Sequence, residues 1–87
     1  MEVIFCTSIK EHIGGTASVT IEAEGCPDLY SLINELGVRF GREFEKLLLG
    51  GESLILLNSK AVMTKGGAGT LLKQGDIIEV LPVIKAG

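Results

Sequence analysis

The chain has 87 residues, enough for one domain with a thin hydrophobic core. The net charge is −3 and the basic residues are scattered, so nucleic acid is not an expected partner. No apolar run approaches the roughly 18 residues that a membrane span needs, so a membrane is not expected either. The acidic opening Met1-Glu2 predicts no signal peptide, and two cysteines are too few for a disulfide scaffold, so we expect a cytoplasmic location.

The first third of the chain predicts two strands. Residues 2–6, EVIFC, are rich in β-branched and aromatic side chains, which favour a strand. Residues 8–15, SIKEHIGG, predict a polar loop. Residues 17–23, ASVTIEA, alternate in polarity, with Val19 and Ile21 on one face, which indicates a half-buried strand. We therefore expect an antiparallel hairpin with a long loop.

The middle of the chain predicts a helix over residues 26–37, CPDLYSLINELG. Its apolar residues fall at i, i+3, i+4 and i+7, which forms one helical face: Leu29, Leu32, Ile33 and Leu36. Pro27 suits a first turn, and Gly37 is the expected C-terminal stop. Residues 42–51, REFEKLLLGG, have apolar side chains at helical spacing and predict a second, shorter helix.

The last third predicts more strands and two turns. Residues 53–62, SLILLNSKAV, predict a strand that turns at Asn58-Ser59 and returns briefly. A turn at residues 74–76 precedes a final strand over residues 77–81. The element order β-β-α-(α)-β-(β)-β predicts an α+β domain over residues 1–81, with four to five strands packed on one main helix. Residues 82–87 would form a flexible tail.

Catalytic and metal sites find little support in the residues. The loop KGGAGT, residues 65–70, has the wrong spacing for a phosphate-binding loop and no helix after it. His12 is the single histidine and lacks a second metal ligand at a suitable spacing. Cys26 precedes a helix without an adjacent cation, which favours packing over reactivity, and Cys6 is expected in the core. The residues therefore give little support to hydrolase or transferase chemistry.

One stretch resembles a known family. Residues 72–87, LKQGDIIEVLPVIKAG, resemble the C-terminus of the MoaD/ThiS family of ubiquitin-like sulfur carriers, which share a Leu-Lys-x-Gly-Asp turn, an apolar strand, a proline and a terminal Gly-Gly. Residues 54–62, LILLNSKAV, are similar to the family's strand and Asn-Gly-Lys turn. Residues 5–15, FCTSIKEHIGG, resemble the first loop of the MoaD branch, the small subunit of molybdopterin synthase.

The resemblance implies a β-grasp fold and a chemical role for the C-terminus. Gly87 would be adenylated and converted to a thiocarboxylate that donates sulfur for molybdopterin, and the molybdenum cofactor, without catalysis by the chain itself. The implied partners are a MoaE-like large subunit and a MoeB/ThiF-like adenylyltransferase, which would use ATP, while the carrier would bind no cofactor and no metal. Because the chain reaches Gly87, we expect no precursor to be trimmed.

The remaining site predictions concern recognition. Partners would recognise the tail through five residues: Pro82, Val83, Ile84, Lys85 and Ala86. Leu81 and Phe5 are the expected docking residues on the exposed sheet face. Ala86 stands where the family has glycine and Lys85 where a small residue is common, so we expect altered or impaired recognition.

Three alternatives remain open. The carrier could serve another pathway, such as thiamine thiazole, cysteine or a tungsten-cofactor relative. It could instead be a ubiquitin-like modifier that joins its C-terminus to lysines of target proteins. It could also be an interaction domain that never uses its tail, in which case removal of Ala86 and Gly87 would leave its function intact.

Overall fold

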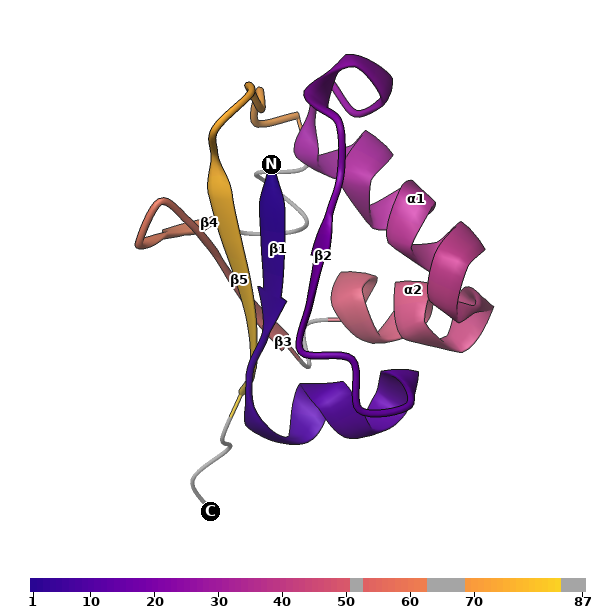
Figure 1. The fold of residues 1–87 in the computed structure, drawn as a ribbon. Helices are drawn as coiled ribbons and strands as arrows, with labels where there is room; N and C mark the ends of the chain where they lie inside the picture. Colours follow the sequence, from indigo (N-terminus) through magenta and orange to yellow (C-terminus); the bar gives the residue numbers. More distant parts are fainter. Residues whose placement is uncertain (51–52, 63–68, 84–87) are drawn as a thin grey trace.

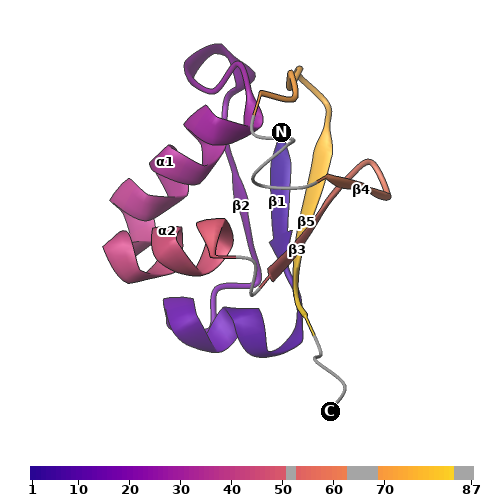
Figure 2. The same ribbon diagram turned by 180° about the vertical axis from the view of Figure 1, so that it is seen from behind.

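The computed structural model describes residues 1–50, 53–62 and 69–83. In chain order its elements are β1 (Glu2–Phe5), η1 (Thr7–Ile13), β2 (Ser18–Thr20), η2 (Ala23–Gly25), α1 (Leu29–Phe40), α2 (Arg42–Leu49), β3 (Ser53–Leu57), β4 (Lys60–Val62) and β5 (Ile77–Pro82). The strands form one mixed sheet in the order β2-β1-β5-β3-β4, in which only β1 and β5 run parallel. The helices cover one face of this sheet (Figures 1 and 2). The predicted α+β class is confirmed.

The core lies between the sheet and α1. Alternate strand residues face the helices, because successive side chains of a strand point to opposite faces. From β1 and β5 these are Val3, Phe5, Ile78 and Val80, all buried. The four apolar residues predicted to share one face of α1 are all buried, at 1–2% exposure, which confirms the spacing argument.

The ends of α1 differ from the prediction. The helix begins after Asp28, whose carboxylate accepts a 2.8 Å hydrogen bond from the Ser31 N–H, and hydrogen bonding to Ser31 lowers the pKa of this carboxyl. The predicted stop at Gly37 is wrong. A Cβ at Gly37 would lie 2.9 Å from the Cβ of Glu45, so this glycine allows α2 to pack closely against α1. The helix ends at Phe40, before Gly41 with φ of +111°.

Two further expectations in the first third are corrected. The stretch predicted as a polar loop contains the 3₁₀-helix η1, which buries Ile9 and Ile13 and ends at Gly14 with φ of +71°. The strand expected over residues 17–23 is shorter, since β2 ends at Thr20 and Ala23 begins η2. The antiparallel pairing of β1 with β2 is confirmed.

Two turns meet at the start of β5. Asn58 and Ser59, with φ of 49° and 72°, join β3 to β4 in the predicted hairpin. The Asn58 side chain donates to Asp76 over 3.0 Å and accepts from the Ile77 N–H over 3.0 Å. Asp76 also accepts from the Lys73 N–H over 2.9 Å and is only 5% exposed. The bond from Asn58, followed by that from Lys73, lowers the pKa of Asp76.

The helices are short. Among the described residues, none is both long enough and apolar enough to cross a membrane.

Candidate functional site

The predicted tail begins at the end of β5, the central strand of the sheet. The strand continues to Pro82, one residue beyond the expected end at Leu81. Pro82 lies opposite Ser53 of β3, and Val83 follows with 41% exposure. The chain therefore leaves the sheet from its middle, between β1 and β3.

Pro82 costs the antiparallel ladder no hydrogen bond. The Asn58 N–H donates to the Ile77 carbonyl over 2.8 Å, and hydrogen-bonded pairs alternate along an antiparallel ladder. Ser53 and Pro82, five pairs further on, therefore occupy a site without ladder hydrogen bonds. The N–H that proline lacks would point toward β1, which has already ended at Phe5. Proline is thus accommodated where pairing stops.

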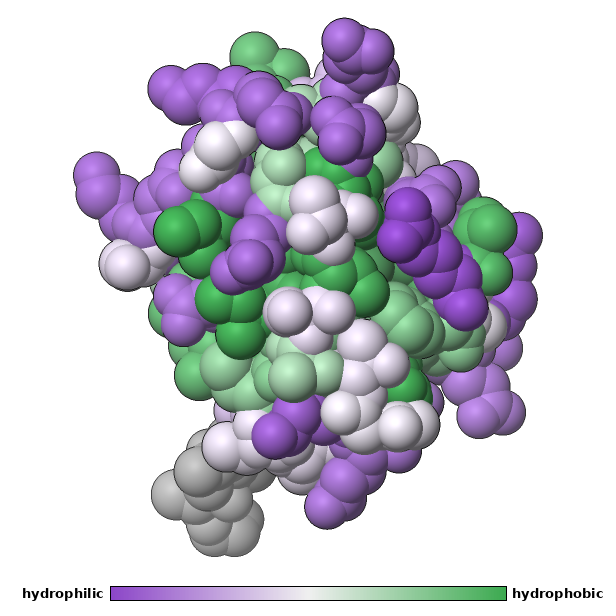
Figure 3. Space-filling view, viewed as in Figure 1, coloured by the Kyte–Doolittle hydropathy of each residue, from purple (hydrophilic) through white to green (hydrophobic). Residues whose placement is uncertain are grey.

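Beside this strand lies a sheet face that no described helix covers. Outward positions on it alternate with the buried ones, and Leu54 of β3 pairs with Leu81 of β5. The apolar residues at the outward positions are Ile4, Leu54, Leu56, Ala61, Ile77 and Leu81, and none of them belongs to the buried core. We call these six residues the open face. Figure 3 shows apolar surface over β5 and toward β4, which hydrophilic side chains border and interrupt. By register, Glu79 of β5 lies among the outward apolar residues, opposite Ile4 and Leu56.

The open face includes one of the two predicted docking residues. Leu81 is half-buried on it, next to Leu54, which is 40% exposed. Phe5 is not part of it, and its predicted docking role is corrected. Phe5 is 2% exposed and packs edge-to-face against Phe40 and Phe44, with ring centroids 5.7 and 5.8 Å apart. It points to the helix side because β1 alternates, so Ile4 takes the outward position instead.

The open face is larger than sequence reasoning predicted. Leu54, Leu56 and Ile77 were missed, although the unbroken apolar run at residues 54–57 carried a signal. A strand that is apolar on both faces is normally covered on both faces. Here one face of β3 packs on the helices and the other is open, which makes the open face a candidate contact surface.

The cysteines do not form a reactive site. Both are free, and Cys26 is buried, with its Sγ 3.9 Å from the Ser31 carbonyl oxygen. Burial raises the pKa of the Cys26 thiol, which disfavours the thiolate and agrees with a packing role. Cys6 is half-buried at the start of η1, outside the core where it was expected.

The other predicted positions give no metal or phosphate site. His12 is exposed, on a helix and not in a loop, and the described residues contain no cluster of metal-binding side chains. Most of the loop at residues 65–70 lies outside the described residues. The same holds for Ile84, Lys85, Ala86 and Gly87, so their predicted roles remain predictions.

Comparison with known families gives one match. The sequence model of the ThiS family matches residues 3–87, almost the whole chain. No curated protein matches in sequence.

Solved structures give several matches. A chain of the complex of subunits 1 and 2 of molybdopterin-converting factor from Helicobacter pylori 26695 is 30% identical, with a TM-score of 0.67, and the match covers 99% of this chain and 96% of that one. The small archaeal modifier protein 1 from Methanosarcina acetivorans is 19% identical, with a TM-score of 0.78 and coverages of 99% and 94%. A chain of the Amycolatopsis orientalis BexX/CysO complex is 21% identical, with a TM-score of 0.74 and coverages of 99% and 98%. These similarities confirm the predicted β-grasp fold.

Proposed function

Because this chain belongs to the ThiS family of small ubiquitin-like sulfur carriers, we propose that it carries sulfur as a thiocarboxylate on Gly87. The observation that carries this proposal is the exit of the chain from the central strand β5 beside the open face. A carrier needs a free end that enters a partner's active site and a body that docks outside that site. Docking raises the effective concentration of the end at the site.

The chemistry proceeds in two steps. A carboxylate oxygen of Gly87 attacks the α-phosphorus of ATP in an adenylyltransferase of the MoeB/ThiF type, and pyrophosphate leaves. Hydrosulfide sulfur then attacks the activated carbonyl carbon, and AMP leaves with the bonding electrons. The net change is one carboxyl oxygen replaced by sulfur. Glycine suits this position because it has no Cβ to shield the reacting carbon.

The rest of the tail would supply reach and recognition. Residues 82–87 span about 20 Å when extended, at roughly 3.3 to 3.6 Å per residue. We propose that Pro82 to Ala86 fill the channel of the partner, and that Ala86, one methyl group larger than glycine, slows this entry. The carrier itself supplies no catalytic side chain, and ATP is bound by the partner.

We further propose that the sulfur goes to molybdopterin through a MoaE-like large subunit. Two observations support this pathway: the likeness of residues 5–15 to the first loop of the MoaD branch, and the 30% identity to a chain of the two-subunit molybdopterin-converting factor. In that proposal the open face is the surface that both the large subunit and the adenylyltransferase cover. A cytoplasmic location suits both partners.

Two other functions have specific support. The similarity to small archaeal modifier protein 1 and to Urm1 from Trypanosoma brucei favours conjugation to target lysines as the second candidate. Conjugates that survive reducing agents in cell extract would establish that role. The similarity to the CysO structures favours a carrier for another acceptor.

Intact mass spectrometry tests the proposal directly. The protein is incubated with an adenylyltransferase of the family, ATP and hydrosulfide, and the expected product carries sulfur in place of one oxygen at Gly87. A control chain that lacks Ala86 and Gly87 should gain nothing. An unchanged mass with several such enzymes would refute the carrier function.

A further inference from the structure

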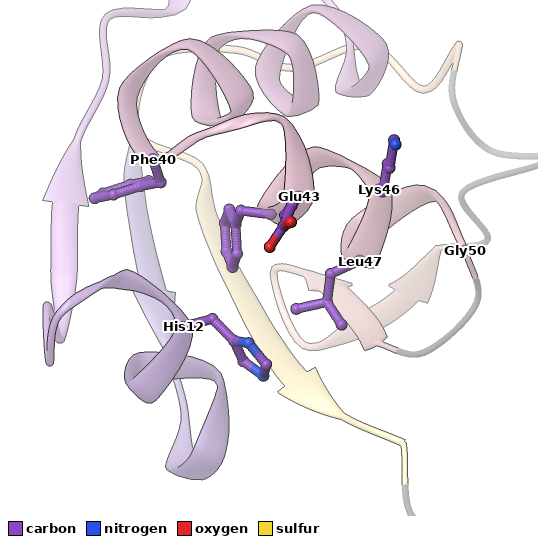
Figure 4. A pocket seen from close by; sticks show the side chains of 7 residues that line it. His12, Phe40, Glu43, Lys46, Leu47 and Gly50 are labelled. Atoms are coloured by element: carbon purple, nitrogen blue, oxygen red, sulfur yellow. The ribbon is translucent and has the colours of Figure 1, made fainter.

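A groove lies on the helix side of the molecule, away from the open face. It occupies about 530 Å³ between η1 and α2, and its lining residues are His12, Phe40, Glu43, Phe44, Lys46, Leu47 and Gly50. Figure 4 shows His12 on η1 facing Leu47 and Glu43 on α2 across the groove. No function described above uses this surface.

The apolar part of the groove is held rigidly. Phe44 is 3% exposed, and its ring packs edge-to-face against Phe40 with centroids 5.8 Å apart. Leu47 is half-buried on the next turn of α2. Since Phe5 of the core fixes Phe44 from below, the groove is already shaped before any partner arrives.

The charged lining residues of the groove are Glu43 and Lys46. Two other acids of the helices pair with cations: Glu35 with Arg39 and Glu45 with Arg42, both at 2.8 Å. Glu43 has no such partner within the described residues and is exposed. In Figure 4 the Glu43 side chain points toward the groove, whereas Lys46 points away from His12. The groove therefore combines apolar lining residues with an unpaired carboxylate at its edge, which suits a cationic side chain with an apolar stem.

We propose that this groove receives an arginine or lysine side chain of the adenylyltransferase that activates Gly87, an inference that rests on the proposed function. The methylene stem would lie on Leu47, next to the buried ring of Phe44, and the cation would pair with Glu43. The net charge of −3 favours a partner with a basic contact surface.

The position of the groove suits such a partner. η1 packs beside β5, where the Cys6 N–H donates to the Val80 carbonyl over 2.9 Å. Both views show η1 and the end of β5 at the same end of the molecule (Figures 1 and 2). A partner that enters the groove therefore lies beside the root of the tail. A partner that also contacts the open face would bind the carrier on both faces of the sheet at β5.

The first test is the kinetics of thiocarboxylate formation. Glu43→Lys should raise the KM for the carrier about tenfold and leave kcat unchanged, because docking is weakened and the chemistry is not. Glu24→Lys, an identical charge change on exposed η2, is the matched control and should alter KM less than twofold. Equal KM values for the two variants would overturn the proposal.

The second test does not depend on the proposed function. A nuclear magnetic resonance titration uses the blocked dipeptide acetyl-Leu-Arg-amide as the probe and acetyl-Leu-Glu-amide as its control. Shift changes at His12, Phe44 and Leu47 should occur with the arginine probe alone and should be lost in Glu43→Gln. Changes that persist in Glu43→Gln, or no changes at these residues, would refute a basic occupant even if Gly87 accepts sulfur.

Discussion

The two ends of β5 are built in opposite ways. At its start, Asp76 is buried and accepts hydrogen bonds from Asn58 and Lys73, while its own carbonyl accepts from the Glu2 N–H over 3.1 Å. At its end, Pro82 lies at a ladder position without hydrogen bonds, and Val83 is exposed. Side-chain hydrogen bonds hold the start of the strand, whereas its last residue occupies a ladder position without hydrogen bonds. In the proposed function, the start of the strand would supply stability and its end would present the tail.

The largest expected effect is on thiocarboxylate formation and comes from the two C-terminal residues. Removal of Ala86 and Gly87 should abolish thiocarboxylate formation and leave the free energy of unfolding unchanged, because these residues follow the last strand. Mass spectrometry and urea unfolding measure the two quantities on the same sample. A marked loss of stability would contradict the division between the two ends.

The next effect concerns the open face beside that end. Leu54→Asp should weaken binding to the adenylyltransferase or the large subunit about 30-fold, because a charge would be buried at the contact. Calorimetric titration measures this affinity. Leu71→Asp is the matched control, since Leu71 is 78% exposed and lies outside the open face. Similar affinities for both variants would remove the open face from the interface.

Asp76, at the start of β5, should contribute more to the free energy of unfolding than the end of the strand. Asp76→Asn replaces an accepting oxygen with an NH₂ group that faces a donor, at an expected cost of about 1–3 kcal/mol in the free energy of unfolding. Urea unfolding measures this cost. Once the variant is folded, its kcat for sulfur loading should match that of the wild type. A fall in kcat would show that the two ends are coupled.

The same carboxyl predicts a pH dependence. The pKa of Asp76 is lowered in the fold from its ordinary value of 3.8, so its contribution to stability is complete above that value. The contribution is lost as the pH falls through the lowered pKa. The stability difference between wild type and Asp76→Asn should therefore be constant near neutral pH and shrink below about pH 4. A difference that grows on acidification would contradict this assignment.

The smallest effect should come from Pro82. Pro82→Ala returns an N–H at a position with no ladder partner, so we expect stability to fall by less than about 1 kcal/mol, mostly through greater freedom of the unfolded chain. Urea unfolding again provides the measurement. A loss as large as that of Asp76→Asn would mean that Pro82 supports the sheet.

The sequence predicted those elements that depend on local spacing. The i, i+3, i+4, i+7 pattern of α1 and the Asn58-Ser59 turn each lie within a short window, and both were found. The helix η1 was missed because Ile9 and Ile13 form only one apolar pair in a polar stretch, and their burial depends on the packing of η1 against the core. Gly37 was wrongly predicted to end the helix, because its role is to allow close packing of Glu45 and this contact cannot be seen in the sequence.

The candidate site was predictable to a different degree. The functional role of the tail was predicted from the resemblance of residues 72–87 to a known family, and not from periodicity. Phe5 could have been placed correctly, since Val3 and Phe5 share one face of a short strand whose partner strands are apolar. The groove needed the structure, because His12 and Leu47 come from elements whose packing no local pattern specifies.

The pairing of β1 with β5 joins the first described strand to the last. Because β5 occupies the centre of the sheet, β1 and β3 have no common neighbour until residues 77–82 have been synthesised. Contacts of such long sequence separation form late and slowly. A ribosome product that stops before this strand would lack the strand that joins its two hairpins and would be open to proteases, so the cell would retain only chains that have reached residues 77–82.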